Sequence, residues 1–188
     1  VGSEMCIRDR YDVMINMELE RARGNSRHGS CGYGVGETIE RNTNAPQYQT
    51  HVGNIFYSRD FFTELLKSIR DEYVPQRLAQ LKLKTGLDID NNSIDRSDEI
   101  IDLYIQQCYY MLRHTSTTPN SVLLENYDLV VFEGAQGLLL DEFHYWFPYV
   151  TRSRTGIFNA VQILKEREVT SAEVFYVTRP YLTRHGAG

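Results

Sequence analysis

The sequence predicts an α/β fold, a mostly parallel sheet flanked by helices, and a strand–helix–strand succession near the end of the chain is the main indication. Residues 128–133 form a short, almost continuous apolar run, as expected of a parallel strand that is buried on both faces. Residues 172–178 repeat the pattern, and residues 156–168 between them carry apolar side chains at helical spacing. Two parallel strands joined by a helix imply a right-handed crossover, which is typical of α/β folds.

Two further elements are predicted in the first third of the chain. Residues 11–23 place apolar side chains among charged ones and are followed by Gly24, so we expect a helix that stops there. Residues 29–36 then hold four glycines in eight positions, a density that helices and strands both disfavour. Residues 51–57 alternate weakly and suggest a short strand.

Two more helices are predicted in the middle of the chain. One begins at Asp60 and reaches at least the residue before Pro75. A polar connection over residues 84–97 follows. The next helix begins after Asp95 or Ser97, because acidic residues then lie near its N-terminal end and an apolar face continues to residue 112.

Composition limits the class of protein and of partner. The chain has 188 residues, of which 41% are hydrophobic and 24% charged, as in an ordinary globular domain. The net charge of −5 argues against a nucleic-acid polymer as partner but leaves small anionic ligands possible. The three cysteines have no metal-site spacing, and no apolar run is long enough for a membrane helix, so we expect a cytoplasmic protein without a membrane partner.

Both ends of the sequence look cut. Residues 1–10 resemble translated sequencing-adapter read-through, which predicts a non-native leader, and position 1 is not methionine. The chain stops within a Gly-rich turn at residues 184–188. We therefore interpret residues 11–188 as an internal fragment of a single domain.

The Gly-rich loop at residues 29–36 is the first candidate site. Glycines allow successive backbone N–H groups to point into one concavity, where they and the Ser30 hydroxyl could surround phosphate oxygens. The loop is not a Walker A motif, because no Gly-Lys-Ser/Thr follows. On these residues alone, a surface turn without a ligand remains an equal alternative.

Two later segments could also carry chemistry. The run 132–141 leaves a predicted strand through small residues, and Gln136 within it can donate and accept hydrogen bonds, as reading a purine edge requires. The run 148–155 interleaves Arg152 and Arg154 with hydroxyl groups before a predicted helix, a combination suited to phosphate or carboxylate. A tight turn and a capped helix start with solvated arginines remain the respective alternatives.

Taken in order, these segments resemble the adenylosuccinate synthetase family over residues 18–188. The family's Phe-Glu-Gly-Ala-Gln-Gly-x-Leu-Leu-Asp segment matches Phe132 to Asp141 at every specified residue. Its Gly-Thr-Thr-Gly-x-Gly-x-Gly loop is similar to Gly29 to Gly36. Its Tyr-Pro-Tyr-Val-Thr-Ser-Ser-Asn and Tyr-x-Thr-Arg-Val-Gly-x-Gly segments are similar to Phe147 to Arg154 and Tyr181 to Gly188.

The resemblance implies a homodimeric ligase of purine nucleotide biosynthesis. Such an enzyme condenses inosine monophosphate with aspartate at the expense of GTP, with Mg²⁺, on a P-loop-NTPase-like sheet that would here be truncated at both ends. The purine 6-oxygen is phosphorylated first, and the aspartate amine then displaces the phosphate. The segments that bind the metal, GTP and aspartate, and the catalytic Asp and His, would lie outside this chain, so no metal ligand is expected within it.

The resemblance also assigns roles to residues. Gln136 is the catalytic candidate, because it would approach the purine 6-oxygen. The monophosphate and ribose would be bound by Gly29, Ser30, Cys31, Gly32, Gln136, Thr151, Arg152, Arg154, Thr183, Arg184 and His185. Arg41 is the candidate for an arginine that reaches the site of the partner subunit.

Departures from the family pattern leave alternatives open. Cys31 replaces a threonine hydroxyl with a weaker donor, and Arg152 and Arg154 replace Ser and Asn, which suggests that they supply phosphate charge. His185 replaces a small apolar residue beside the ribose. The phage-type relative that makes 2-aminoadenylosuccinate from deoxy-GMP therefore remains an alternative, and so does a catalytically incomplete nucleotide-binding fragment.

Overall fold

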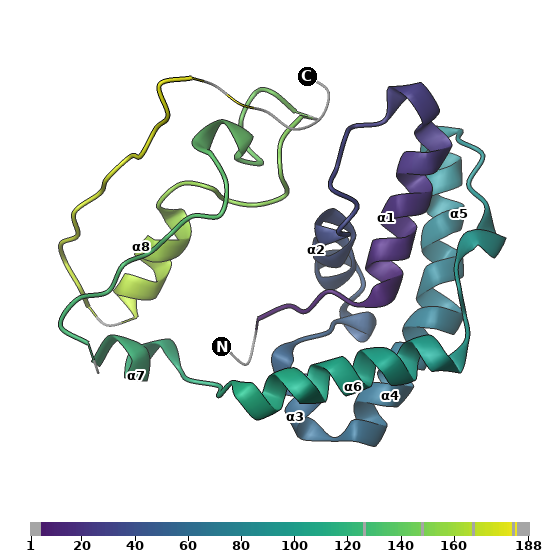
Figure 1. Cartoon of the computed structure of the whole chain (residues 1–188), viewed down its shortest axis with the longest axis horizontal. Helices are drawn as coiled ribbons and strands as arrows, with labels where there is room; N and C mark the ends of the chain where they lie inside the picture. Colours follow the sequence, from purple (N-terminus) through teal and green to yellow (C-terminus); the bar gives the residue numbers. More distant parts are fainter. Residues whose placement is uncertain (1–4, 126, 148, 167, 182, 184–188) are drawn as a thin grey trace. The chain divides into compact units, whose positions relative to one another are not determined.

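The computed structural model of the chain describes residues 5–125, 127–147, 149–166, 168–181 and 183. The chain divides into two compact units, unit 1 (Val1–Thr117) and unit 2 (Thr118–Gly188). The helices of both are labelled in Figure 1. That both units belong to a single domain stays a prediction.

Unit 1 is built from helices. The α-helices are α1 (Arg10–Arg23), α2 (Val35–Asn44), α3 (Val52–Tyr57), α4 (Arg59–Ser68), α5 (Val74–Thr85) and α6 (Asp98–His114). Short helical turns connect them: η1 (Gly24–Ser26), η2 (Pro46–Tyr48), η3 (Ile69–Tyr73) and η4 (Asn91–Ser93).

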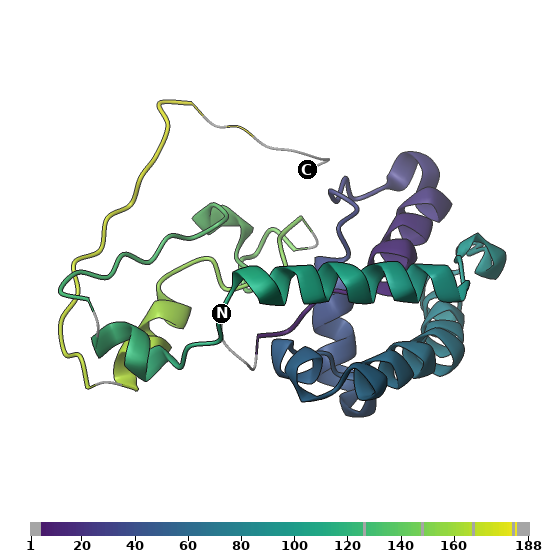
Figure 2. The same cartoon turned by 60° about the horizontal axis from the view of Figure 1, so that its bottom comes forward.

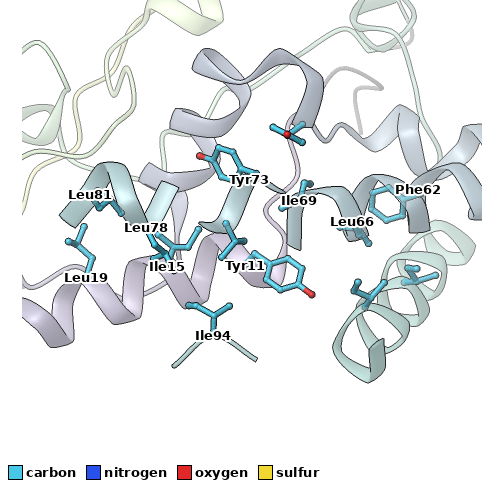
Figure 3. Packing of buried hydrophobic residues seen from close by; sticks show 14 of the residues in the cluster. Tyr11, Ile15, Leu19, Phe62, Leu66, Ile69, Tyr73, Leu78, Leu81 and Ile94 are labelled. Atoms are coloured by element: carbon cyan, nitrogen blue, oxygen red, sulfur yellow. The ribbon is translucent and has the colours of Figure 1, made fainter. Parts of the chain in front are cut away.

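The core of unit 1 lies where α1 packs against α5. Ile15 and Leu19 of α1 face Leu78 and Leu81 of α5, as Figure 3 shows, and all four side chains are buried. Helix α6 runs past α3 and α4 in both views (Figures 1 and 2). This core supports α1 and thereby the loop that follows it.

Helices α4 and α5 form one continuous helical stretch through the π-helical turn η3. Proline lacks a backbone N–H, and its ring clashes with the preceding helical turn. Pro75 lies in the first turn of α5. The backbone N–H of Val74 donates to the carbonyl of Ile69, five residues earlier. The wider turn accommodates the proline without ending the helix.

The residues that precede α1 contact the rest of unit 1. Ile7 N–H donates to the carbonyl of Thr50 at 3.0 Å, and Val52 N–H donates to that of Met5 at 3.0 Å. The carboxylate of Asp9 caps α1 by accepting from the backbone N–H groups of Tyr11 and Asp12. That residues 1–10 are a non-native leader stays a prediction, but those that the structure describes hydrogen-bond to the rest of unit 1, and Asp9 among them is buried.

The helices predicted from periodicity are mostly confirmed. The helix over residues 11–23 is α1, and the helix expected after Asp95 or Ser97 is α6, with Ser97 at its N-cap. The predicted strand at residues 51–57 is wrong, because these residues form α3. Helix α4 begins one residue before Asp60, since the Ser58 hydroxyl accepts from Phe61 N–H and caps it.

Unit 2 contains α7 (Asn120–Glu125), η5 (Leu138–Leu140) and α8 (Phe158–Lys165). Helix α8 confirms the helix predicted over residues 156–168, over a shorter span. No side chain of unit 2 is buried among those that the structure describes. Outside these helical segments, much of the described part of unit 2 is irregular chain.

The predicted α/β fold with its mostly parallel, P-loop-NTPase-like sheet is wrong for this structure. The described residues form no sheet, and the one β-bridge among them pairs Cys6 with His51. Both runs predicted as buried strands are exposed, with Val131 at 79% and Val177 at 97%. A strand requires a neighbouring backbone to accept and donate its hydrogen bonds, and neither run has one among the described residues.

Candidate functional site

The Gly-rich loop lies along one side of α1, where two polar side chains bind its backbone. Glu20 Oε2 accepts the N–H of Gly29 at 3.1 Å. One turn earlier, Asn16 Oδ1 accepts the Ser30 hydroxyl at 3.3 Å and the N–H of Gly34 at 3.2 Å. The loop is therefore attached to α1 at its first two residues and again near its end.

Gly34 allows the close approach of the loop to α1. Its φ of +74° lies in the left-handed region, which side chains with a Cβ disfavour. A Cβ placed there would lie 2.6 Å from the backbone carbon and oxygen of Asp12. Only glycine fits this position, and it is also the N-cap of α2, so the loop leads directly into the N-terminus of that helix.

The predicted monophosphate residues of unit 1 lie together in this loop. Ser30 and Cys31 are exposed, and the Cys31 thiol is free. The φ of Gly32 is +71°, which turns the chain before α2 begins. The N–H groups of Gly29, Gly32 and Gly34 already donate to side chains. The first turn of α2 provides donors and positive potential that suit an anion.

Arg41 is fully buried and has partners within its own chain. Its Nε and Nη2 donate to the two carboxylate oxygens of Asp12 at 3.0 and 2.6 Å. Nη1 donates to the carbonyl of Tyr48 at 2.5 Å, and Nη2 also donates to the Thr50 hydroxyl at 3.0 Å. An inter-subunit role would require the guanidinium to leave these partners, so that role stays a prediction.

In unit 2, Asp141 joins the two segments that the sequence singled out. Its Oδ2 accepts the N–H of Thr155 at 2.8 Å, and its Oδ1 accepts that of Phe143 at 3.0 Å. These N–H donors, Phe143 first, hold the pKa of Asp141 below its ordinary value. Thr151 N–H also donates to the carbonyl of Leu140 at 2.8 Å, so Thr151 lies beside the earlier segment.

The remaining predicted residues of unit 2 differ in their surroundings. The guanidinium of Arg154 lies 3.8 Å from the ring centroid of Phe143 and 4.6 Å from that of Phe158. Gln136, Arg152 and Thr183 are exposed, so they are accessible to a ligand. Arg184 and His185 lie outside the described residues.

Other features bear on ligands and location. Within the described ranges, no three His, Cys, Asp or Glu side chains gather as a metal site would require. No helix in the same ranges has the length and apolar character needed to cross a membrane. A hollow of about 620 Å³ along α6, lined by Arg59, Leu103 and Tyr110 among others, contains none of the predicted site residues.

Sequence reasoning missed the side chains that hold the loop, which are Asn16 and Glu20. The available signal was their spacing, because Asp12, Asn16 and Glu20 follow one another at four-residue intervals and so share one face of α1. Polar residues at that spacing usually face solvent, and here the face is covered by the loop and α2.

A comparison with family models matches residues 3–188 to the family described as adenylosuccinate synthetase. The chain belongs to the adenylosuccinate synthetase family. The match includes the Gly-rich loop on α1 as well as both segments that Asp141 joins.

Individual relatives agree with this assignment. The adenylosuccinate synthetase of Ectopseudomonas mendocina (strain ymp) is 26% identical over 178 residues, which cover 95% of this chain and 39% of that protein. That of Pseudomonas aeruginosa (strain LESB58) is 27% identical with the same coverage, 95% and 39%. That of Neosartorya fischeri is 27% identical and covers 100% of this chain and 42% of that protein. The chain thus spans about two fifths of the length of these relatives.

Proposed function

We propose that the polypeptide containing this chain is a ligase of purine nucleotide biosynthesis that condenses inosine monophosphate with aspartate, using GTP. The family match over residues 3–188 carries this proposal. The Gly-rich loop supports it, because its exposed Ser30 and the N-terminus of α2 form an arrangement suited to a phosphate.

The proposed reaction has two steps. The purine 6-oxygen forms a bond to the γ-phosphorus of GTP while the adjacent ring nitrogen loses its proton, and GDP leaves. The amine of aspartate then forms the bond to carbon 6 while the carbon–oxygen bond breaks, so phosphate leaves and the amine loses a proton. Phosphorylation makes the oxygen a leaving group, which it is not in the free purine.

In this proposal the chain binds the nucleotide. Gly29, Ser30, Cys31 and Gly32 bind the monophosphate, and Thr151 with Arg152 and Arg154 adds donors and charge. Gln136 lies at the purine 6-oxygen, where its amide can donate to the developing phosphate ester. Thr183, Arg184 and His185 border the ribose, and Arg41 is the candidate for a partner-subunit contact in a homodimeric cytoplasmic enzyme.

We expect the magnesium ligands of the proposed enzyme to lie outside this chain. The family implies Mg²⁺, and no set of three His, Cys, Asp or Glu side chains gathers in the described parts of this chain. No role proposed for its residues uses the metal. Because the chain spans 39–42% of its relatives, we expect the isolated 188-residue chain to release no phosphate from GTP.

Phosphate release by the complete polypeptide tests the proposal. The assay contains aspartate, GTP and Mg²⁺ with either inosine monophosphate or deoxy-GMP. Release that requires inosine monophosphate and aspartate together is the expected result. Phosphate release that occurs with deoxy-GMP but not with inosine monophosphate would move the assignment to the 2-aminoadenylosuccinate branch. If neither nucleotide supports phosphate release, the ligase proposal would be removed.

A further inference from the structure

One face of α1 carries a row of acceptors beneath the Gly-rich loop. Asp12, Asn16 and Glu20 lie at successive four-residue steps, and each contacts the loop or α2. The outer two are carboxylates. Asn16 is the neutral member, and it lies between them under the centre of the loop.

Asn16 connects two parts of the loop through one oxygen. Its Oδ1 accepts the N–H of Gly34 at 3.2 Å and the hydroxyl of Ser30 at 3.3 Å. The Ser30 residue is a predicted phosphate contact, whereas Gly34 is the N-cap of α2. A single side chain therefore fixes where the hydroxyl stands relative to the helix N-terminus.

The two contacts differ in strength. A distance of 3.3 Å is long for a hydroxyl donor, which usually lies 2.7–2.8 Å from its acceptor. The Ser30 hydroxyl can therefore turn its hydrogen toward an incoming anion at little cost. The Gly34 contact does not compete with that anion, and it continues to hold the loop against α1.

The chemical type of residue 16 also matters. A carboxylate here would accept the same two donors but would add a negative charge beneath a loop proposed to bind a phosphate dianion. An amide oxygen accepts without that charge. The neighbouring Glu20 carboxylate is paired with Arg23, so its charge is already offset.

We infer that Asn16 is a positioning residue for nucleoside monophosphate binding, acting through Ser30 and Gly34 without touching the nucleotide. The inference rests on the proposed function. Asn16 holds the loop in its binding conformation before the nucleotide arrives, and this lowers the entropic cost of ordering the loop on binding.

Steady-state kinetics of the complete polypeptide test this role, with Asn16→Ala compared with Asn44→Ala. Asn44 is an exposed residue at the end of α2, remote in sequence from the loop contacts. Loss of the Gly34 contact, about one hydrogen bond, in Asn16→Ala should raise the KM for the monophosphate up to about tenfold. The kcat and the KM values for GTP and aspartate should stay within about threefold, and Asn44→Ala should match the wild type.

Asn16→Asp is a second variant that separates positioning from folding. It keeps an oxygen that can accept from Gly34 and Ser30, so the loop stays attached, and it adds a negative charge. At low salt its KM for the monophosphate should rise about tenfold. At about 1 M salt, where the Debye length is roughly 3 Å, this rise relative to the wild type should become smaller but should not disappear, because residue 16 is partly buried beneath the loop. The Asn16→Ala defect should persist at both salt concentrations.

The outcomes distinguish this inference from the proposed function. Wild-type protein that turns over no purine monophosphate would overturn both. Active wild type with an unchanged monophosphate KM in Asn16→Ala would overturn the positioning role alone. Equal rises in the KM values for monophosphate, GTP and aspartate would overturn it too, since general loosening of the protein would then explain the defect.

Discussion

Arg41 and Asp12 form a bidentate ion pair inside unit 1, with Nε to Oδ1 at 3.0 Å and Nη2 to Oδ2 at 2.6 Å. Both side chains are buried, with exposed fractions of 0% and 1%. Asp9 Oδ2 lies 2.9 Å from the same Nη2. One cation thus meets two carboxyl groups away from solvent, between α1 and α2.

Replacing Arg41 should destabilise the protein strongly. In Arg41→Met the two carboxyl groups stay buried without their cation, and breaking a buried pair on one side typically costs about 3–5 kcal/mol. The exposed pair between Lys67 and Glu64 provides the control, because Lys67→Ala should leave the free energy of unfolding nearly unchanged. Urea unfolding followed by circular dichroism measures both, and similar free energies of unfolding for the two variants would contradict the prediction.

Asp9 should make stability fall as pH rises toward neutrality. Burial first, and the neighbouring Asp12 second, raise the pKa of Asp9 from 3.8 to about 7, against the opposing effect of Arg41. Between these two values the folded protein binds more protons than the unfolded chain, so the free energy of unfolding decreases with increasing pH. Across this pH range, the free energy of unfolding of Asp9→Asn should fall by roughly 1–4 kcal/mol less than that of the wild type.

Urea unfolding at pH 4, 5.5 and 7.5 measures the effect of Asp9→Asn. Asn retains the ability to cap α1, so the cap itself is preserved. The exposed and uncharged residue Asn44 offers a control in Asn44→Ala, for which we expect the wild-type pH profile. A profile for Asp9→Asn as steep as that of the wild type would show that another group is responsible.

Helices α1 and α6 could be predicted from sequence because their signals are local. In both, the apolar spacing and the terminal residues lie within the helix itself. The strand predictions were wrong, because an apolar run such as residues 128–133 indicates burial but does not specify the neighbour that accepts its backbone hydrogen bonds. The loop was found from its glycines. Its support was missed because Asn16 is an ordinary polar helix residue until the chain folds back onto it.

Gly34→Ala should destabilise the protein more than Gly86→Ala. Both glycines are in the left-handed helical region, with φ of +74° and +69°, so both variants carry a backbone penalty of about 1–2 kcal/mol. A Cβ at position 34 also meets the backbone of Asp12 at 2.6 Å, whereas no atom lies within 4 Å of a Cβ at position 86. We expect an additional loss of about 1–3 kcal/mol for Gly34→Ala by thermal or urea unfolding. Equal losses would mean that the loop moves away from α1 freely.

The double variant Arg152→Ala/Arg154→Ala should bind the monophosphate more weakly. If these guanidinium groups supply phosphate charge, losing both should raise the Kd about 10- to 100-fold, as expected for charge-assisted hydrogen bonds. Arg154→Lys should retain most affinity, since it keeps the charge above Phe143 and Phe158. Calorimetric titration of the complete polypeptide compares these variants with Arg113→Ala in α6. An unchanged Kd for the double variant would remove the phosphate role.

The three cysteines offer a test of the loop without any substitution. Cys31 lies in the proposed monophosphate site, and its thiol is free and exposed. Cys6 is also free and exposed but lies in the segment beside Thr50, while Cys108 is buried. Burial first raises the pKa of Cys108, which lowers its thiolate fraction and reactivity further.

Alkylation with iodoacetamide should therefore modify Cys6 and Cys31 and leave Cys108 intact. Saturating inosine monophosphate should slow modification of Cys31 about tenfold or more, because a bound phosphate occupies the loop and blocks access of the reagent to the thiol. Cys6 serves as the internal control and should react at an unchanged rate. Peptide mass spectrometry over a time course reads each site separately. Equal rates for Cys31 with and without nucleotide, in protein shown to bind it, would place the phosphate away from this loop.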